Sequence, residues 1–183
     1  SAPLVGPLVI NEVMYHPAAN ESSMEWVEFH NQMAVDLDVS GWRISGDIEF
    51  TFPIRARVPG GGYIVLSVNP AALKSATGIT NVVGSFAGRL SNSGGTLELR
   101  NNSGWFVNRV RYDTSGDWPV APDGSGVSLA KLAPDTSSEP PGHWRSSAQV
   151  GGTPGRVNFL SGDSPESPVV FNEVARAGGT NFW

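Results

Sequence analysis

Apolar and polar residues alternate along residues 24–53, with the period of a β-strand that has one face buried. The runs 24–31, 41–45 and 48–53 are rich in Trp, Val, Ile, Phe and Thr, which suit a pleated and half-buried surface. Gly46 and Asp47 separate the last two runs, and their number and chemistry predict a tight hairpin turn. We therefore expect three strands here, and the rest of the chain to be organised around them.

Further strands are predicted on both sides of this segment. The runs of strand type cover residues 8–15, 63–68, 82–86, 96–100, 106–112 and 127–132, and residues 143–146 are expected to add a last short pairing. A turn at residues 101–104 predicts a second hairpin, between the runs 96–100 and 106–112. One short helix is expected at residues 71–76, because Asn69 and Pro70 precede it and are typical of a helix start.

About eight or nine short strands, with a turn signal about every ten residues, favour a two-sheet β-sandwich. A closed barrel is the alternative. The chain has 183 residues, which is enough for one domain with a sizeable core and additional segments. Its 22 glycines and 14 prolines lie between the apolar runs, so they mark turns and do not indicate disorder. The predicted class is all-β.

With these strands in place, a set of motifs resembles the lamin tail domain family. The motifs occupy residues 8–13, 25–31, 40–45, 52–53, 62–66 and 91–99, together with Gly104. The resemblance covers residues 8 to about 112 and implies an immunoglobulin-like β-sandwich. It places Trp42 at the buried tryptophan of such folds, and we predict that Trp42 and Val27 face each other in the core.

Motifs further along the chain are similar to those of the bacterial branch of this family. They are Tyr112, Trp118-Pro119, Asp-Gly-x-Gly-x-Ser-Leu at 123–129, Trp-x-x-Ser at 144–147 and Gly-Thr-Pro-Gly-x-x-Asn at 152–158. The resemblance implies a non-catalytic module of a secreted or cell-surface multidomain protein, acting in adhesion, protein interaction or domain spacing. The chain has no heptad repeat, so the sequence does not predict the filament assembly of nuclear lamins.

Three regions are predicted along the chain. Residues 1–159 form the sandwich with a loop-rich C-terminal part, residues 160–167 form a linker rich in Ser, Gly, Asp and Pro, and residues 168–183 begin a second repeat. The last region repeats, at 168–174, the pattern Pro, three apolar residues and Asn-Glu-Val found at 7–13. Since an unpaired strand tends to add to a sheet edge, residues 168–175 also predict strand-mediated self-association.

The sequence predicts no enzyme. There is no cysteine, and His16, His30 and His143 lie far apart without the spacing of a metal site. The net charge of −5 and the pI of about 5.1 argue against non-specific binding to nucleic acid or to an anionic membrane. No run of about 18 apolar residues occurs, so no membrane span is predicted.

The alternative function is that of a ligand-binding module for glycan or nucleic acid. Trp118 and Trp144 lie in loop or edge segments, where flat indole faces would contact a sugar, unless they cover the end of the sandwich. Arg100, Arg109 and Arg111 surround one hairpin and would contact phosphates, although the acidic net charge makes nucleic acid an unexpected partner.

Two groups of carboxylates stand out. Asp113, Asp117 and Asp123 lie in a long Gly/Pro-rich loop, and such loops supply the oxygen ligands of calcium. We therefore expect no cofactor other than a structural calcium at this loop, with solvated carboxylates as the alternative. Glu25 and Glu28 point to opposite faces of a strand, and Glu12 is expected to approach one of them if the first two strands pair.

Overall fold

The computed structural model describes residues 6–18 and 22–160. The strands are β1 Leu8–Met14, β2 Trp26–Asn31, β3 Leu37–Asp38, β4 Arg43–Gly46, β5 Ile48–Thr51, β6 Arg57–Val58, β7 Tyr63–Ser67, β8 Val82–Val83, β9 Ala87–Gly88, β10 Gly95–Arg100, β11 Phe106–Tyr112, β12 Leu129–Lys131 and β13 Trp144–Ser146. The helical elements are α1 Pro70–Thr77 and two 3-10 turns at Ser22–Met24 and Pro141–His143. The chain is thus built mainly from strands, as predicted.

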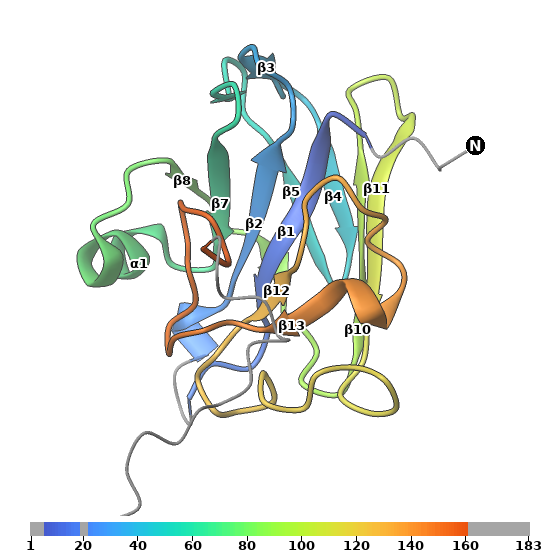
Figure 1. Cartoon of the computed structure of the whole chain (residues 1–183). Helices are drawn as coiled ribbons and strands as arrows, with labels where there is room; N and C mark the ends of the chain where they lie inside the picture. The colour runs from blue at the N-terminus through green and yellow to red at the C-terminus, as the bar shows by residue number, and fades with distance from the viewer. Residues whose placement is uncertain (1–5, 19–21, 161–183) are drawn as a thin grey trace, which may run out of the picture.

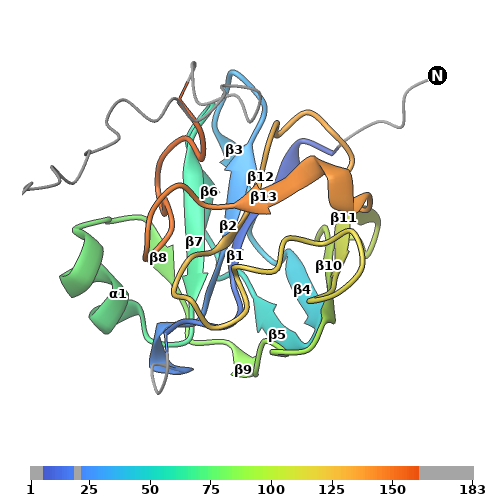
Figure 2. The same ribbon diagram turned by 60° about the horizontal axis from the view of Figure 1, so that its bottom comes forward.

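Two sheets pack face to face across one apolar core (Figure 1). The first sheet has the order β13-β12-β1-β2-β7-β8, and the second has the order β11-β10-β4-β5-β9. A two-stranded ribbon, β3-β6, closes one end. Every strand pairing is antiparallel except that of β7 with β8. Figure 2, which brings the bottom of Figure 1 forward, shows the two layers side by side. The predicted immunoglobulin-like β-sandwich is confirmed.

The alternation of residue types decides which face of each strand enters the core. In β2, Val27 and Phe29 join the central apolar cluster, whereas Trp26 joins a second, smaller cluster on the outer face. Trp42 lies just before β4 in the second sheet and is 7% exposed, and Val27 is fully buried in the first sheet. Both belong to the central cluster, as predicted.

The tight turn between β4 and β5 forms as predicted, and it contacts strands β10 and β11 of the same sheet. Gly46 has φ +117°, and a Cβ there would lie 2.0 Å from the carbonyl oxygen of Thr96, so only glycine fits. The Asp47 carboxylate accepts hydrogen bonds from the backbone N–H of Thr96 and the hydroxyl of Tyr112.

The predicted helix is also present. The Asn69 side chain caps it by accepting a hydrogen bond from the backbone N–H of Ala72 at 3.1 Å.

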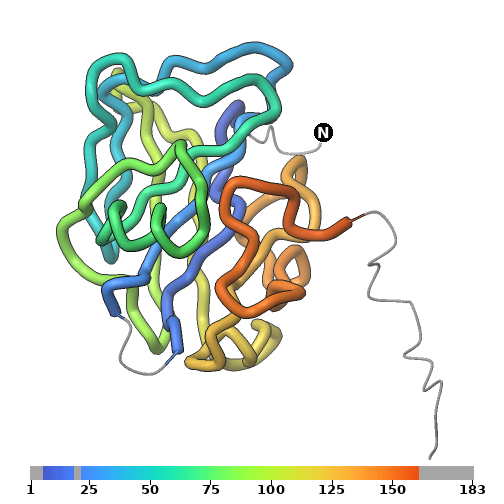
Figure 3. The backbone as a smooth tube through the Cα atoms, turned by 90° about the vertical axis from the view of Figure 1, so that its left-hand side faces the viewer, coloured from blue at the N-terminus to red at the C-terminus, as the bar shows by residue number. Residues whose placement is uncertain are grey.

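The C-terminal part of the described chain is built into the first sheet. Strand β12 pairs with β1 through Val13 and Leu129, and β13 pairs with β12 through Leu129 and Ser146. Residues 147–160 then run along the outer face of this sheet, as the orange and red part of the tube in Figure 3 shows. The segment that follows β11 is therefore a structural part of the sandwich.

The expectation of eight or nine strands is wrong, because the described residues contain thirteen. The difference comes mainly from two-residue pairings such as β6. Two residues are too few to show an alternating pattern.

The second repeat expected at 168–183 lies outside the described residues, as does nearly all of the linker expected at 160–167. Among the helices that the structure describes, none has the length and apolar character needed to cross a membrane.

Replacing Trp42 by alanine is expected to lower the free energy of unfolding by about 3–5 kcal/mol, because it removes a large buried side chain from the core. Trp105→Ala is the matched control, since the Trp105 side chain is 73% exposed and its removal should cost less than about 0.5 kcal/mol. Urea unfolding of the two variants and the parent measures both values. Equal losses in the two variants would contradict the assignment of Trp42 to the core.

Candidate functional site

Two glutamates are buried opposite each other on the outer face of the first sheet. Glu12 of β1 and Glu28 of β2 are partners in the strand register, and both side chains are fully buried. A β-bulge between Ile10 and Glu12 shifts the alternation of β1 by one residue. Because of this shift, Ile10 and Val13 both enter the core while Glu12 points outward. The expected approach of Glu12 to a second glutamate is confirmed, and the partner is Glu28.

Hydrogen-bond donors for Glu12 come from the segment after β11. The hydroxyl of Ser128 donates to Oε1 of Glu12. Thr153 donates twice, from its backbone N–H to Oε1 at 2.9 Å and from its hydroxyl to Oε2 at 2.8 Å. A buried carboxylate is very costly unless it is hydrogen-bonded, and here the C-terminal segment meets that requirement.

Glu28 is held in the same way by residues from both ends of the chain. Its Oε1 accepts from Nδ2 of Asn11 at 2.9 Å, and its Oε2 accepts from the backbone N–H of Gly155. Asn158 completes the network, because its Nδ2 donates to the carbonyl oxygens of Asn11 and Lys131, both at 2.9 Å. The network therefore fastens residues 153–158 to strands β1, β2 and β12.

The two carboxyl groups differ in their electrostatic surroundings. Burial raises the pKa of Glu12, although hydrogen bonds from Ser128 and Thr153 and the charge of Arg156 oppose the rise. Burial, followed by the charge of Glu12, raises the pKa of Glu28 well above its usual value. Glu28 accepts fewer hydrogen bonds than Glu12 and is repelled by its charge, so Glu28 is the member of the pair that keeps a proton more readily.

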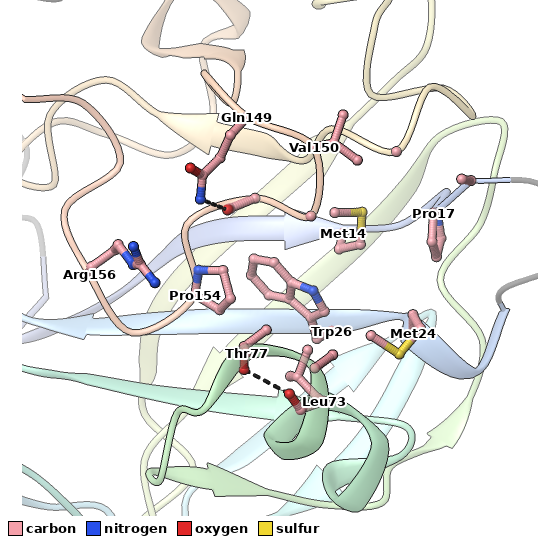
Figure 4. A pocket seen from close by; sticks show the side chains of 15 residues that line it. Met14, Pro17, Met24, Trp26, Leu73, Thr77, Gln149, Val150, Pro154 and Arg156 are labelled. Carbon is pink, nitrogen blue, oxygen red and sulfur yellow. Dashed lines mark hydrogen bonds between the residues drawn. The ribbon is translucent and has the colours of Figure 1, made fainter.

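An open groove lies beside this network, between α1 and the loop 149–156. It has a volume of about 330 Å³. The side chains of Met14, Met24, Trp26 and Leu73 line its apolar part (Figure 4). Met14, Trp26 and Leu73 belong to the smaller apolar cluster on the outer face of the first sheet, and the partly buried Met24 packs against it. Figure 3 shows α1 in green and the C-terminal loop in orange and red on the two sides of the blue strands.

The groove wall and the carboxylate network meet at Gly152. This residue has φ +73°, and a Cβ there would lie 2.7 Å from Oε1 of Glu12 and 2.8 Å from Cζ2 of Trp26. The loop thus contacts both the buried carboxylate and the tryptophan of the groove. Among the fifteen residues that line the groove, only Arg156 is charged, and its side chain is exposed. The groove therefore combines an apolar surface with one cation.

The two tryptophans proposed as sugar-binding surfaces do not present free faces. Trp144 is fully buried and Trp118 is 9% exposed, and both belong to the central apolar cluster. Their ring centroids lie 6.4 Å apart, and the indole N–H of Trp144 donates to the carbonyl oxygen of Ser138 at 2.9 Å. The expectation that they bind a ligand is corrected to the alternative, in which they cover the end of the sandwich, because large apolar surfaces pack away from water.

The three arginines of the β10–β11 hairpin form ion pairs. Arg100 contacts Glu98 at 2.7 Å, and Arg109 contacts Glu139 at 2.6 Å. Arg111 lies 3.5 Å from Glu139. A phosphate would have to compete with these carboxylates, so the arrangement does not favour a nucleic-acid site at this hairpin.

The structure does not bring the three aspartates of the predicted calcium loop together. Oδ1 of Asp113 accepts hydrogen bonds from the backbone N–H of Thr114 at 2.7 Å and from the hydroxyl of Ser115 at 2.7 Å. Oδ1 of Asp123 lies 2.6 Å from Nδ1 of His16, and Asp117 is exposed. Within residues 6–18 and 22–160, no group of three His, Asp or Glu side chains is arranged to hold a metal. Calcium binding stays a prediction.

A comparison with known protein families gave a match for the N-terminal part of the chain. The family model of the lamin tail domain matches residues 1–114, which is more than half of the chain. The chain belongs to the lamin tail domain family. A comparison with curated proteins found no match. The matched part ends just after β11, so Ser128, Thr153 and Asn158 lie in a segment beyond the lamin tail domain match. Sequence reasoning missed these three as part of the site, although all three lie in the downstream motifs.

The contribution of the Glu12–Glu28 pair to the stability of this lamin tail domain is expected to fall as pH rises above about 4.3, the pKa of an unfolded glutamate. Since the folded pKa of Glu12 and of Glu28 is raised, the folded state binds more protons than the unfolded state. Their contribution is complete below the unfolded pKa and is lost as pH rises through the folded values. Each unit of upward shift corresponds to about 1.4 kcal/mol.

The measurement is urea unfolding at about pH 5 and about pH 8, for the parent and for Glu28→Gln. Other titrating groups contribute equally to both proteins and cancel in the difference. Glu28→Gln removes the titrating group and the repulsion from Glu12, so its decline in stability should be smaller. Equal declines would contradict the raised pKa of Glu28 in the folded state.

A separate expectation concerns the contact at Gly152. Gly152→Ala should lower the free energy of unfolding by about 1–3 kcal/mol more than Gly151→Ala, because its methyl group meets Glu12 and Trp26. Gly151 is a close control, since its φ of +85° carries similar backbone strain and a Cβ there meets nothing within 4 Å. Thermal unfolding of the two variants measures the difference, and equal losses would mean that the loop is not seated on the carboxylate.

Proposed function

We propose that this lamin tail domain is a non-catalytic interaction module of a bacterial exported or cell-surface multidomain protein, acting in adhesion or in domain spacing. The family, an immunoglobulin-like domain without enzymatic activity, supports the non-catalytic role. The similarity of the motifs at 118–119, 123–129, 144–147 and 152–158 to the bacterial branch supports the exported setting. The residues of these motifs carry much of the carboxylate network.

The groove between α1 and the loop 149–156 is the observation that carries the interaction role. Its volume of about 330 Å³ lies at the lower end of the range for binding pockets, about 300–1,000 Å³. Met14 and Met24 supply flexible and polarisable side chains, which adapt to different apolar partners. Because the groove is open along one side, it suits one large side chain of an extended protein segment whose backbone stays outside.

The charge at the groove limits the chemistry of the partner. Arg156 forms none of the ion pairs found among the described residues, and no acidic residue lines the groove. A carboxylate near the apolar side chain of the partner would therefore meet a cation. We propose a partner segment in which a large apolar residue stands next to Asp or Glu.

The test is selection of phage-displayed random peptides on the immobilised chain, followed by titration of synthetic peptides. The enriched peptides should contain a large apolar residue beside an acidic one. Ala76→Phe should weaken their binding at least about tenfold, because the new ring occupies the groove and displaces a side chain whose burial contributes about 1.5–3 kcal/mol.

Ala71→Phe is the matched control for this test, since Ala71 is exposed on the same helix and does not line the groove. Arg156→Gln should weaken acidic peptides more than their amide analogues, and Arg145→Gln, another exposed arginine, should not. Peptides that bind the parent and Ala76→Phe equally well would remove the groove from the proposal.

A further inference from the structure

Exposed apolar side chains gather at one end of the sandwich. The described residues include nine large apolar side chains that are exposed, and five of them lie on three neighbouring connections. The five are Met33 and Val35 between β2 and β3, Ile54 between β5 and β6, and Trp105 and Phe106 at the β10–β11 hairpin. All three connections lie at the top of Figure 1, the first two near the label of β3 and the β10–β11 hairpin to the right of them. A Cβ on Gly41 would lie 3.4 Å from Cβ of Asn102, which places the second and third connections in contact through the turn before β4.

Ile54 stands at the apex of a turn that is held in an unusual conformation. The backbone N–H of Ala56 donates to the carbonyl oxygen of Pro53 at 3.1 Å, and Ile54 is 87% exposed. Arg55 has φ +70° and is the only non-glycine residue with positive φ in the described part of the chain. Its backbone N–H donates to the hydroxyl of Ser40 at 2.8 Å. Residues held in this sparsely populated region are often found at functional sites.

The other two connections are also fixed by hydrogen bonds. The buried Asn31 donates from Nδ2 to the carbonyl oxygen of Val35 at 2.9 Å and accepts from the backbone N–H of Met33 at 2.9 Å. In the hairpin, Oδ1 of Asn101 accepts from the backbone N–H of Trp105 at 2.9 Å. The side chains of Val35 and Trp105 are 66% and 73% exposed. The apolar side chains are therefore presented on ordered turns.

Positive charge accompanies these side chains. Residues 32–43, 52–62 and 98–106 contain four arginines and three acidic residues, Asp36, Asp38 and Glu98, whereas the whole chain has a net charge of −5. The arginines are Arg43, Arg55, Arg57 and Arg100, and all four are exposed. Arg100 pairs with Glu98 at 2.7 Å, whereas Arg43, Arg55 and Arg57 form none of the ion pairs found among the described residues. Asp113, Asp117 and Asp123 lie in the connection after β11, at the bottom of Figure 1. The end that carries the apolar side chains is thus more positive than the chain as a whole, and three aspartates lie in a connection at the opposite end.

We infer that this end of the domain docks onto an anionic lipid surface. The apolar side chains project separately from three turns with arginines between them, which suits a fluid surface better than the continuous packing of a protein interface. Tryptophan favours the boundary between lipid and water, and arginine keeps its guanidinium at the headgroups while its stem contacts apolar groups. Aliphatic apices such as Ile54 and Val35 offer no stacking surface to nucleic-acid bases, so nucleic acid is the less favoured partner.

The test is flotation of the full chain with phosphatidylcholine vesicles and with mixed phosphatidylcholine–phosphatidylglycerol vesicles. Binding to the mixed vesicles should be stronger and should weaken as salt is added. The double variant Ile54→Ser, Trp105→Ser should lose at least about tenfold in binding, because two apolar side chains leave the bilayer boundary. Arg55→Gln with Arg57→Gln should lower binding to the mixed vesicles by about fivefold for each arginine.

The matched control is Val120→Ser with Val157→Ser, which changes two exposed apolar residues outside the three connections and should leave binding unchanged. Since all the altered side chains are exposed, equal melting temperatures of variants and parent will show that folding is retained. Three results would overturn the inference: no binding to either vesicle, equal loss in the control and in the Ile54–Trp105 variant, or binding to double-stranded DNA in place of the vesicles.

Discussion

The hydrogen-bonded burial of Glu12 opposite Glu28 is the constraint on which the C-terminal half of the domain depends. Two carboxyl groups cannot be buried side by side unless donors surround them and one of them keeps its proton. The donors come from Asn11 on β1 and, above all, from Ser128, Thr153 and Gly155. Removing this segment would leave the outer face of β1 and β2 without its cover. The lamin tail match ends at residue 114, yet the domain continues to residue 158 in structural terms.

Such a network is not the arrangement that gives the highest stability, because well-packed apolar residues often replace buried ionic groups without loss. Its specific effect here is to fix one loop in one place. The loop 149–156 is seated by Thr153 and Gly155 on the two glutamates, and Gly152 allows it to approach Glu12 and Trp26 closely. The same loop forms one wall of the groove. The shape of the groove therefore depends on the hydrogen bonds that hold this loop on the carboxyl pair.

The groove and the apolar end with its arginines lie on different parts of the molecule. The groove lies on the outer face of the first sheet, whereas the exposed Ile54 and Trp105 project from connections at one end of both sheets. Contacts at these two surfaces would not compete for the same residues. A domain with two separate contact surfaces on a rigid sandwich would hold one partner at a set distance from the other, which agrees with a role in adhesion or spacing.

The sequence by itself determined the sheet-forming segments, the hairpin at Gly46 and Asp47, the helix capped by Asn69 and the burial of Trp42, because strand period and turn chemistry are local properties. It also indicated that Glu12 would approach a second glutamate. Only the tertiary structure decided that Glu28 is this partner and that Ser128 and Thr153 cover the pair. Alternation along a strand shows which side chains share a face, but it carries no information about the distant segment that covers that face. Trp118 and Trp144 illustrate the same limit, since their loop or edge positions left open whether they bind a ligand or cover the end of the sandwich, and the tertiary structure shows that they are buried.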